Sequence, residues 1–367
     1  MTDDVDFAPD TSAVADVSHI LDELNEAQRD AVTAPPGHML VLAGAGSGKT
    51  RVLVHRIAWL CQVEGASPFN IFAVTFTNKA AAEMRSRVEK LQGMPSAGMW
   101  VGTFHGLSHR LLRSHWKEAG LPQTFQILDA DDQYRLIRRV LKALELDESR
   151  WPPRQAQAFI NARKDEGQRP PHIDTAHNPV YVQLVRIYTA YEAACKRAGV
   201  IDFAELLLRT LELLRDNDSL REHYQHRFRH ILVDEFQDTN TIQYALVRLL
   251  AGQQNKVFIV GDDDQAIYAW RGARVENIHR FQKDFKDTQI VRLEQNYRST
   301  TTILSAANAL IDNNNDRLGK KLWTSGEDGE QILFYNAFNE LDEARFVIER
   351  AKQWAEQGHA RAEIAIL

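Results

Sequence analysis

The sequence has few of the features that mark secreted, disulfide-stabilised or membrane-spanning proteins. Its 367 residues contain only two cysteines, Cys61 and Cys195, without CxxC spacing, so it offers neither a disulfide framework nor a structural zinc site. The longest apolar runs, such as residues 39–43 and 71–74, are far shorter than the ~20 residues that cross a bilayer. The N-terminus lacks the Lys or Arg start of a secretion signal. We therefore expect a cytoplasmic protein with no membrane partner.

Lys and Arg are absent from the first 23 positions, which hold seven acids. This segment accounts for the acidity of the chain: the formal net charge is −6, whereas the remaining residues carry 43 acids against 44 Lys and Arg, a net of +1. Residues 1–18 are predicted to form an acidic, mobile tail. Phosphate-binding surfaces are usually basic, so the total charge argues mildly against a nucleic-acid partner. The neutral body of the chain carries no such argument.

The remaining composition is that of a globular chain, with 44% hydrophobic and 26% charged residues and length for two or three domains of ~150 residues. Short, continuously apolar runs alternate with helical patterns such as residues 79–91 and 243–250. That alternation predicts an α/β fold with a parallel sheet covered on both faces. The predicted strands are Met39–Ala43, Ile71–Thr75, Trp100–Gly102, Ile231–Val233, Val257–Val260, Ile290–Leu293, Ile332–Tyr335 and Ile364–Leu367.

A long helical segment interrupts this alternation, because no strand pattern occurs between residues 102 and 231. We expect an all-helical insertion in the α/β domain, and a second sheet that begins near Ile290. The predicted helices of the interruption are Phe104–Trp116, Ala130–Leu144, Pro153–Lys164, Val180–Ala198 and Asp202–Arg215. In the fourth of these, apolar residues at helical spacing predict one buried face, made of Val180, Leu184, Ile187, Tyr188 and Tyr191.

A glycine-rich turn follows the first predicted strand and precedes a helical pattern at residues 52–60. It reads Ala43-Gly44-Ala45-Gly46-Ser47-Gly48-Lys49-Thr50, and its three glycines allow backbone amides to approach phosphates closely. In such a P-loop the lysine reaches the β and γ phosphates and the hydroxyl binds Mg²⁺. Ala43 stands where the strict pattern has glycine. The alternative, a glycine turn beside a surface lysine, is disfavoured by the strand-turn-helix context.

Two carboxylates, Asp234 and Glu235, follow another predicted strand. A P-loop needs a carboxylate that orders Mg²⁺, which we assign to Asp234, and Glu235 is suited to polarise an attacking water. This division of labour favours hydrolysis over transfer to a bound acceptor. Gln265 and Arg298 follow the next two strands and suit the sensing and stabilisation of a γ-phosphate. Taken singly, each of these two is better explained as a loop residue that satisfies backbone groups.

Aromatic residues occur in three predicted loops, beside hydroxyl, basic or glycine residues. Base stacking on such rings, worth ~1–3 kcal/mol per base, holds single-stranded nucleic acid without reading its sequence. Phe104 is more readily explained as a core residue. The basic run at residues 105–117 is equally compatible with a solvated helix face and with phosphate contacts. The loops contain Phe76 and Asn78, then His105, and finally Tyr268, Trp270 and Arg271.

In combination, these motifs resemble those of superfamily 1 DNA helicases of the UvrD/PcrA/Rep type. The likeness extends from about Ile20 to Leu367. In chain order, residues 24–29 are similar to the Q motif, 43–50 to motif I, 73–83 to motif Ia, 101–109 to motif Ib, 233–240 to motif II, 260–272 to motif III and 293–300 to motif IV.

The resemblance implies a role for each matching residue. The implied ATP-binding residues are Gln28 at the adenine edge, Gly44, Ala45, Gly46, Ser47, Gly48, Lys49, Thr50 and Arg51 near the phosphates, Tyr297 stacked on adenine, and Arg298 as an arginine finger. The implied catalytic residues are Lys49, Asp234, Glu235, Gln265 and Arg298, with Mg²⁺ held by Thr50 and Asp234. The implied track for single-stranded DNA contains Phe76, Asn78, His105, Tyr268, Trp270 and Arg271, and Gln265 would couple the γ-phosphate to this track.

The family also implies two RecA-like lobes with ATP between them, and movement in the 3′→5′ direction on single-stranded DNA. By this likeness the chain contains lobe 1A (residues 19–107 and 201–288), the helical subdomain 1B (108–200) and the start of lobe 2A (289–367). The implied cofactors are ATP and Mg²⁺. The implied partners are single-stranded DNA, single-strand/duplex junctions, and proteins of mismatch repair and nucleotide excision repair. We expect a monomer or weak dimer at the bacterial nucleoid.

Two alternatives stay open at this point. Motifs V and VI do not occur in the sequence, so we expect the N-terminal portion of a helicase. Such a chain would bind nucleotide, single-stranded DNA or repair partners without unwinding. A P-loop kinase or another small-molecule phosphotransferase is disfavoured, because Glu235 suits water activation and the aromatic loops would have no purpose.

Overall fold

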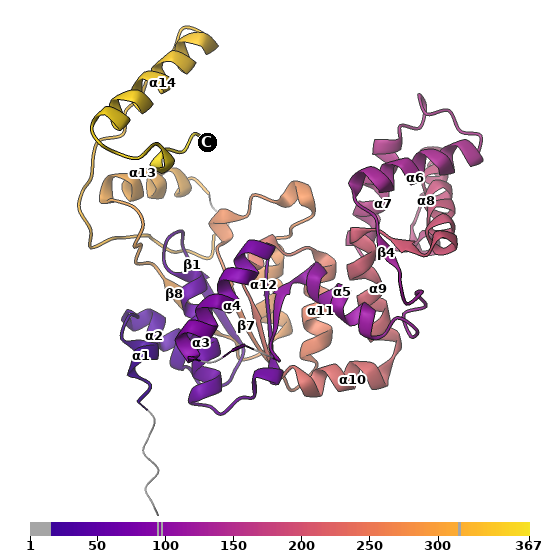
Figure 1. The fold of residues 1–367 in the computed structure, drawn as a ribbon, viewed down its shortest axis with the longest axis horizontal. Helices are drawn as coiled ribbons and strands as arrows, with labels where there is room; N and C mark the ends of the chain where they lie inside the picture. The colour runs from indigo at the N-terminus through magenta and orange to yellow at the C-terminus, as the bar shows by residue number, and fades with distance from the viewer. Residues whose placement is uncertain (1–15, 94, 97, 315–316) are drawn as a thin grey trace, which may run out of the picture.

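A six-stranded parallel sheet forms the centre of the chain in the computed structural model (Figure 1). The structure describes residues 16–93, 95–96, 98–314 and 317–367, so most of the predicted acidic tail lies outside the described residues. The strand order is β3-β2-β6-β7-β1-β8. The strands are β1 (Met39–Ala43), β2 (Ile71–Thr75), β3 (Trp100–Thr103), β6 (His230–Val233), β7 (Lys256–Gly261) and β8 (Gln289–Leu293). The predicted α/β fold with a parallel sheet is therefore confirmed.

Helices cover both faces of this sheet, which explains why its strands are apolar at successive positions. In β1 all five residues are buried, with Met39 and Val41 in one apolar cluster and Leu40 and Leu42 in the other. The first cluster includes residues of α1 (Ser18–Leu21), α2 (Glu26–Thr33), α3 (Lys49–Gln62) and α4 (Asn78–Gln92). The second includes residues of α5 (Phe104–Ser114), α9 (Phe203–Asp216), α10 (Asp218–Arg227), α11 (Thr241–Ala251) and α12 (Glu276–Asp284).

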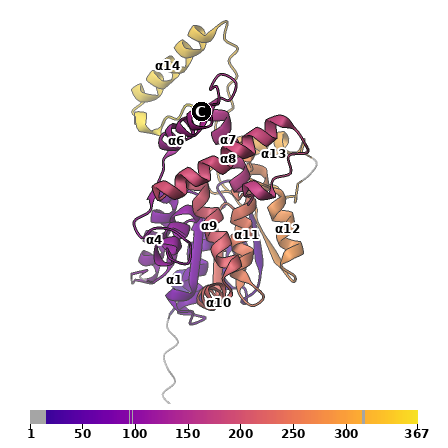
Figure 2. The ribbon, with the colours of Figure 1, turned by 90° about the vertical axis from the view of Figure 1, so that its right-hand side faces the viewer.

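The predicted helical insertion forms a separate apolar cluster at one end of the molecule (Figures 1 and 2). It contains α6 (Ala130–Ala143), α7 (Pro153–Asp165) and α8 (Pro179–Ala198). The short strands β4 (Gln126–Ile127), before α6, and β5 (Val200–Ile201), after α8, pair with each other. In α8 the predicted apolar face is buried from Leu184 to Tyr191, but Val180 is 45% exposed, because it lies in the first turn of the helix, outside the cluster.

The C-terminal part of the chain differs from the sequence expectation. A second sheet was expected near Ile290, but β8 hydrogen-bonds to β1 and completes the first sheet. Residues 332–335 and 364–367, expected as strands, form neither strands nor helices. Their apolar side chains are largely exposed, so no neighbouring strand in the described part of the chain pairs with them. The segment instead contains α13 (Thr301–Ile311) and α14 (Glu340–Glu356).

Short 3₁₀ turns account for several of the remaining connections. They are η1 (Pro68–Asn70), η2 (Pro170–His172), η3 (Phe236–Asp238), η4 (Asp263–Gln265), η5 (Ala269–Arg271) and η6 (Arg361–Glu363). Among the helices of the described ranges, none has both the length and the apolar character required to cross a membrane.

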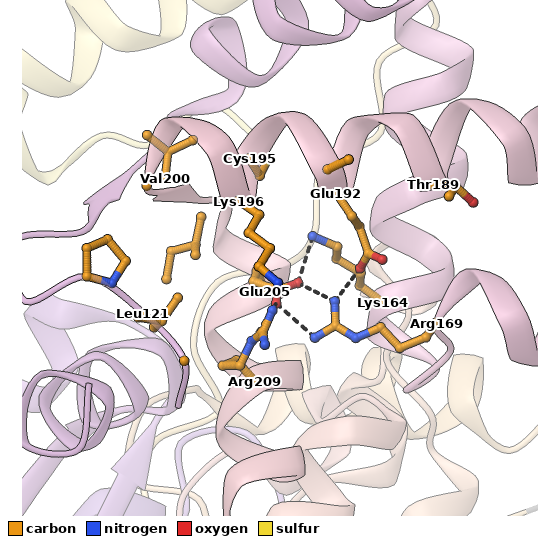
Figure 3. A pocket seen from close by; sticks show the side chains of 15 residues that line it. Leu121, Lys164, Arg169, Thr189, Glu192, Cys195, Lys196, Val200, Glu205 and Arg209 are labelled. Carbon is orange, nitrogen blue, oxygen red and sulfur yellow. Dashed lines mark hydrogen bonds and ion pairs between the residues drawn. The ribbon is translucent and has the colours of Figure 1, made fainter. Parts of the chain in front are cut away.

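Buried ion pairs join the helical insertion to the sheet lobe (Figure 3). The Lys164 ammonium, from α7, lies 2.7 Å from Asp202 and 2.9 Å from Glu205, at the N-terminus of α9, and its side chain is 2% exposed. Arg169 binds Glu205, Glu192 and Glu212. Burial alone would raise the pKa of Glu205, but Lys164 and Arg169 outweigh it and lower that pKa. The ions therefore depend on one another for their charged state.

Lys164→Met should reduce the free energy of unfolding by about 3–5 kcal/mol, because removing one partner leaves buried carboxylates without their ammonium. Urea unfolding followed by far-UV circular dichroism measures this loss. The matched control is Arg135→Met, which breaks an exposed ion pair with Asp132 and should change stability by less than about 1 kcal/mol. A loss from Lys164→Met as small as the control's would contradict the assigned role of the buried pair.

Candidate functional site

The loops that follow the strands bring most of the predicted site residues to one edge of the sheet. Because all six strands are parallel, their carboxyl ends lie at the same edge, where ligands bind in open α/β sheets. The loops after β1, β6, β7 and β8 carry the predicted phosphate-binding and catalytic residues. Those after β2, β3 and β7 carry the predicted aromatic track.

The loop after β1 has the backbone geometry of a phosphate cradle. The backbone φ angles of Gly46 and Gly48 are 66° and 88°, in the left-handed region that residues with a side chain rarely adopt. Gly48 caps the N-terminus of α3, where free amides and the helix dipole favour an anion. A Cβ atom on Gly48 would lie 2.7 Å from Nε2 of Gln28, so this position also has no room for a side chain.

Gln28 lies beneath this loop and is fully buried. Its Nε2 donates to the Ser47 carbonyl at 2.8 Å, and its Oε1 accepts from the Asn25 amide at 3.1 Å. Both polar side-chain atoms of Gln28 therefore hydrogen-bond to backbone groups. The expected role of Gln28 at the adenine edge stays a prediction, and the contact to the P-loop backbone is one that the sequence did not indicate.

The Lys49 ammonium contacts two other predicted catalytic residues. It lies 2.9 Å from Oε1 of Gln265 and 2.9 Å from Oε2 of Glu235. These residues come from the loops after β1, β7 and β6, which are far apart in the sequence. Beside them, the Thr50 hydroxyl donates to Oδ2 of Asp234 at 3.3 Å.

The Asp234 carboxyl group of this cluster has a raised pKa. Burial and the charge of Glu235 raise its pKa to about 6, although Lys49 and the hydrogen bonds from the Glu235 amide and Thr50 oppose the rise. Asp234 is therefore charged mainly above that pH. A carboxylate and a hydroxyl are hard oxygen donors, which suit Mg²⁺, so the Thr50–Asp234 pair could hold such an ion.

Gln237 supports this cluster and was missed in the sequence analysis. Its Nε2 donates to Oε2 of Glu235 at 2.8 Å, and its Oε1 accepts from the Asp262 amide at 2.9 Å. It thus connects the loops after β6 and β7. Glu235 itself has φ of 48°, which is uncommon for a residue with a side chain. The nearest sequence signal was the polar run after Glu235, which does not reveal a partner 25 residues away.

The loop after β8 lies against the P-loop. Asn296 is 2% exposed, and its Nδ2 donates to the Ala45 carbonyl at 2.6 Å while its Oδ1 accepts from the amides of Arg298 and Ser299. The Tyr297 amide donates to the Gly46 carbonyl at 2.9 Å. A Cβ atom on Gly46 would lie 2.8 Å from Cβ of Arg298, so Arg298 follows the P-loop closely.

The side chains of Tyr297 and Arg51, both predicted to bind ATP, lie in different surroundings. The Tyr297 ring is 52% exposed, and its hydroxyl accepts from Nδ2 of Asn25 at 2.7 Å, which places it beside the segment that carries Gln28. Arg51 instead donates to the Glu23 carbonyl at 3.3 Å, outside the P-loop. The structure therefore brings Tyr297 toward the predicted adenine side and does not direct Arg51 to the phosphate side.

Aromatic residues line the neighbouring edge. The rings of Phe76 and Tyr268 are stacked, with centroids 5.1 Å apart, and Trp270 lies 6.3 Å from Tyr268 with 73% of its surface exposed. Asn78 accepts from the Thr103 hydroxyl at 3.5 Å, the upper limit for such a bond. The side chain of Arg271 lies outside the described part of the structure.

A cavity of about 340 Å³ opens beside these rings, between the strand-end loops and the helical insertion. Its wall includes Phe76, Tyr268, His105 and Phe203. Burial lowers the pKa of His105 to about 4, so at neutral pH the imidazole offers an uncharged ring. Phe203 is 54% exposed and was not among the residues predicted for the track.

Two arginines of the basic run on α5 contact aromatic rings of the chain itself. The Arg110 guanidinium lies 4.3 Å from the Trp100 ring centroid, and that of Arg113 lies 3.9 Å from the Phe125 ring. Arg113 also donates to the carbonyls of Gln123 and Phe125. Phe104 is buried, as the core interpretation predicts. Arg110 thus lies on a β3 residue, and Arg113 ties α5 to the following loop.

Comparisons with known proteins agree with this geometry. The family model for the UvrD/REP helicase N-terminal domain matches residues 24–286, and that for the UvrD-like helicase C-terminal domain matches residues 291–367. The chain is 66% identical to DNA helicase II of Salmonella typhimurium and 65% identical to that of Escherichia coli, each over 96% of this chain and 49% of the relative. It is 42% identical to the ATP-dependent DNA helicase PcrA of Staphylococcus aureus, over 95% of this chain and 48% of the relative.

The chain thus spans about half the length of the curated relatives it matches. Its six-stranded parallel sheet is consistent with a RecA-like helicase lobe. The match to the N-terminal domain includes the P-loop, Asp234, Glu235 and Gln265 and the aromatic loops, and the match to the C-terminal domain includes the loop after β8.

Asn296→Ala should lower the free energy of unfolding by about 2 kcal/mol, because it leaves the Ala45 carbonyl and two amides without their side-chain partner. Chemical denaturation measures this loss. Asn314→Ala, at an exposed position, is the control and should have little effect. Equal stability of the two variants would show that Asn296 does not hold the two loops together.

Proposed function

This chain belongs to the UvrD/REP helicase family, and we propose on that basis that it couples ATP hydrolysis to 3′→5′ movement on single-stranded DNA, as part of an ATP-dependent DNA helicase. The observation that carries the proposal is the meeting of Lys49, Glu235 and Gln265 at the end of the P-loop. The aromatic loops lie at the same edge of the sheet. A phosphotransferase for small molecules would have no use for them.

For the nucleotide, the proposal assigns each group according to its position. The amides of residues 44–48 and the Lys49 ammonium bind the phosphates, and Tyr297 provides a ring for adenine beside Gln28. Thr50 and Asp234 would hold Mg²⁺, which supplies charge neutralisation at the β and γ phosphates when bound. Glu235 accepts a proton from the attacking water. To do so, its carboxylate must release the Lys49 ammonium and bind that water instead. Gln265 and Arg298 contact the γ-phosphate.

For DNA, the proposal places successive bases against the rings of Phe76, Tyr268 and Trp270. Stacking is tolerant of sequence, because every base has an aromatic face. Phe203 and the neutral His105 extend the same surface into the cavity between the lobe and the insertion. Asn78 and Arg271 are the proposed polar contacts to the strand.

The wider role is proposed from similarity alone. We propose action at single-strand/duplex junctions in mismatch repair and nucleotide excision repair, with repair proteins as partners, at the nucleoid in the cytoplasm and as a monomer or weak dimer. We also propose that the sheet and its covering helices correspond to lobe 1A, α6–α8 to subdomain 1B, and the segment after β8 to lobe 2A. Helix α5 buries its apolar face against the sheet, so its packing favours lobe 1A.

Release of phosphate from Mg²⁺-ATP, measured with and without single-stranded DNA, tests the proposed function. We expect hydrolysis by the 367-residue chain that rises when DNA is added. Lys49→Ala should abolish it and should weaken nucleotide binding by more than about tenfold, because the variant loses the ammonium at the β and γ phosphates.

Lys90→Ala, on the exposed side of α4, is the matched control and should behave as the parent chain does. Nucleotide binding without any DNA-stimulated hydrolysis would favour the alternative in which this chain only binds its ligands. Equal nucleotide affinity of the Lys49→Ala and parent chains would show that the phosphate assignment is wrong.

Trp270→Ala should weaken the binding of a single-stranded oligonucleotide by roughly 5- to 150-fold at fixed salt, the equivalent of one lost base stack. Fluorescence anisotropy with a labelled oligothymidine measures it. Phe69→Ala removes another exposed ring, at the start of β2 and hence at the opposite edge of the sheet, and should leave affinity unchanged. Unchanged affinity of the Trp270 variant would remove this residue from the proposed track.

A further inference from the structure

A lysine far along the chain is buried within the acidic loop that follows β7. The Lys320 side chain is 2% exposed, and its ammonium lies 2.7 Å from Asp262, 2.6 Å from Asp263 and 2.8 Å from Asp264. Burial alone would lower the pKa of Lys320, but these carboxylates outweigh burial and raise it. Lys320 is therefore a charged group enclosed by three consecutive aspartates.

The residues before Lys320 hold the same loop. The Arg317 guanidinium donates from Nε and Nη2 to the two carboxylate oxygens of Asp264, each at 2.8 Å, which is the bidentate geometry. The Leu318 amide donates to Asp263 at 2.9 Å. The segment 317–320 thus supplies two cations and one amide to aspartates that precede it by 53 or more positions.

Neutralisation is needed because three like charges lie together. One oxygen from each of Asp262, Asp263 and Asp264 lies within 4.8 Å of the others. Like charges at this distance repel, and more strongly when they are partly buried. Lys320 and Arg317 reduce the charge of the group from −3 to −1. The ammonium occupies the centre of the carboxylates, where a divalent cation would otherwise be needed to offset them.

This ion cluster is continuous with the nucleotide site. Asp262 to Gln265 form one tight turn, in which the Gln265 amide donates to the Asp262 carbonyl at 3.0 Å. At the end of that turn, Oε1 of Gln265 accepts from the Lys49 ammonium. Leu322 lies against the P-loop, so that a Cβ atom on Gly44 would overlap its side chain. Residues 317–322 therefore contact both loops that face the phosphates.

We propose that Lys320, assisted by Arg317, is a positioning residue of the ATPase site: it fixes the aspartate turn so that Gln265 is held at the γ-phosphate. The inference rests on the proposed function and deepens it, because it names a residue that determines discrimination between nucleoside triphosphate and diphosphate. Lys320 acts through the turn, and only the part of the site that meets the γ-phosphate depends on it.

Equilibrium titration with Mg²⁺-ATPγS and with Mg²⁺-ADP tests this role in the 367-residue chain. Lys320→Met keeps the length of the side chain and removes its charge. We expect its affinity for ATPγS to fall about tenfold, the equivalent of one charged contact, while its affinity for ADP stays within about twofold of the parent's. Lys320→Arg keeps the positive charge and should restore the preference for ATPγS.

Two further variants sharpen the result. Lys321→Met alters the adjacent, exposed lysine and should leave both affinities unchanged. Arg317→Met removes the second cation and should reduce the preference for ATPγS in the same direction but by less, about threefold, because Lys320 remains. If Lys320→Met fails to fold, the Arg317→Met variant still tests the inference.

The outcomes separate the inference from the proposed function. If the parent chain does not bind Mg²⁺-nucleotide, the proposed function fails whatever the variants do. If the parent prefers ATPγS and the variants at residues 320 and 317 keep that preference, the inference is wrong. Equal losses of ATPγS and ADP affinity would also overturn it, since they would indicate a general structural role.

Discussion

The contact of one ammonium with two loops is the interaction on which the organisation of the site depends. Lys49 lies at the N-terminus of α3 and binds Glu235 and Gln265, so it ties together the loops after β1, β6 and β7. This is possible only because the strands are parallel, since antiparallel neighbours would place alternate loops at opposite edges. The strand order β6-β7-β1 makes these loops immediate neighbours. The chemistry proposed here is therefore a consequence of the topology.

Two further buried cations join parts of the chain that are distant in the sequence. Lys164 joins the helical insertion to α9, and Lys320 joins the segment after α13 to the loop after β7. Each is enclosed by carboxylates, because a buried charge is tolerated only with partners in good geometry. Apolar contacts of similar area would restrict the relative orientation of two segments less. Ion pairs restrict both distance and orientation, which suits segments that position catalytic groups.

The sequence was sufficient where a signal is local. The strands β1, β2, β3, β6 and β7 were predicted because a central parallel strand is apolar at successive positions, and the P-loop was predicted because its glycines adjoin a lysine and a threonine. The failures involve partners that are far apart in the chain. The apolar pattern of residues 290–293 predicts a strand but not that it pairs with β1. Likewise, nothing near Gln237, Phe203 or Lys320 indicates the loops that they contact.

Two loops connect the proposed nucleotide site to the proposed DNA track. In the loop after β7, Gln265 contacts Lys49, and three residues later Tyr268 stacks on Phe76. In the loop after β6, Glu235 contacts Lys49, and five residues later Asn240 lines the aromatic cavity. Each loop thus has one end in the proposed nucleotide site and the other at the proposed DNA track. In the loop after β6 the 3₁₀ turn η3 lies between these ends, and in the loop after β7 only residues 266 and 267 do, so few residues separate the two proposed sites. The proposed coupling of the two sites thus has a short path through each loop, and Gln237 and Lys320 hold these loops in place.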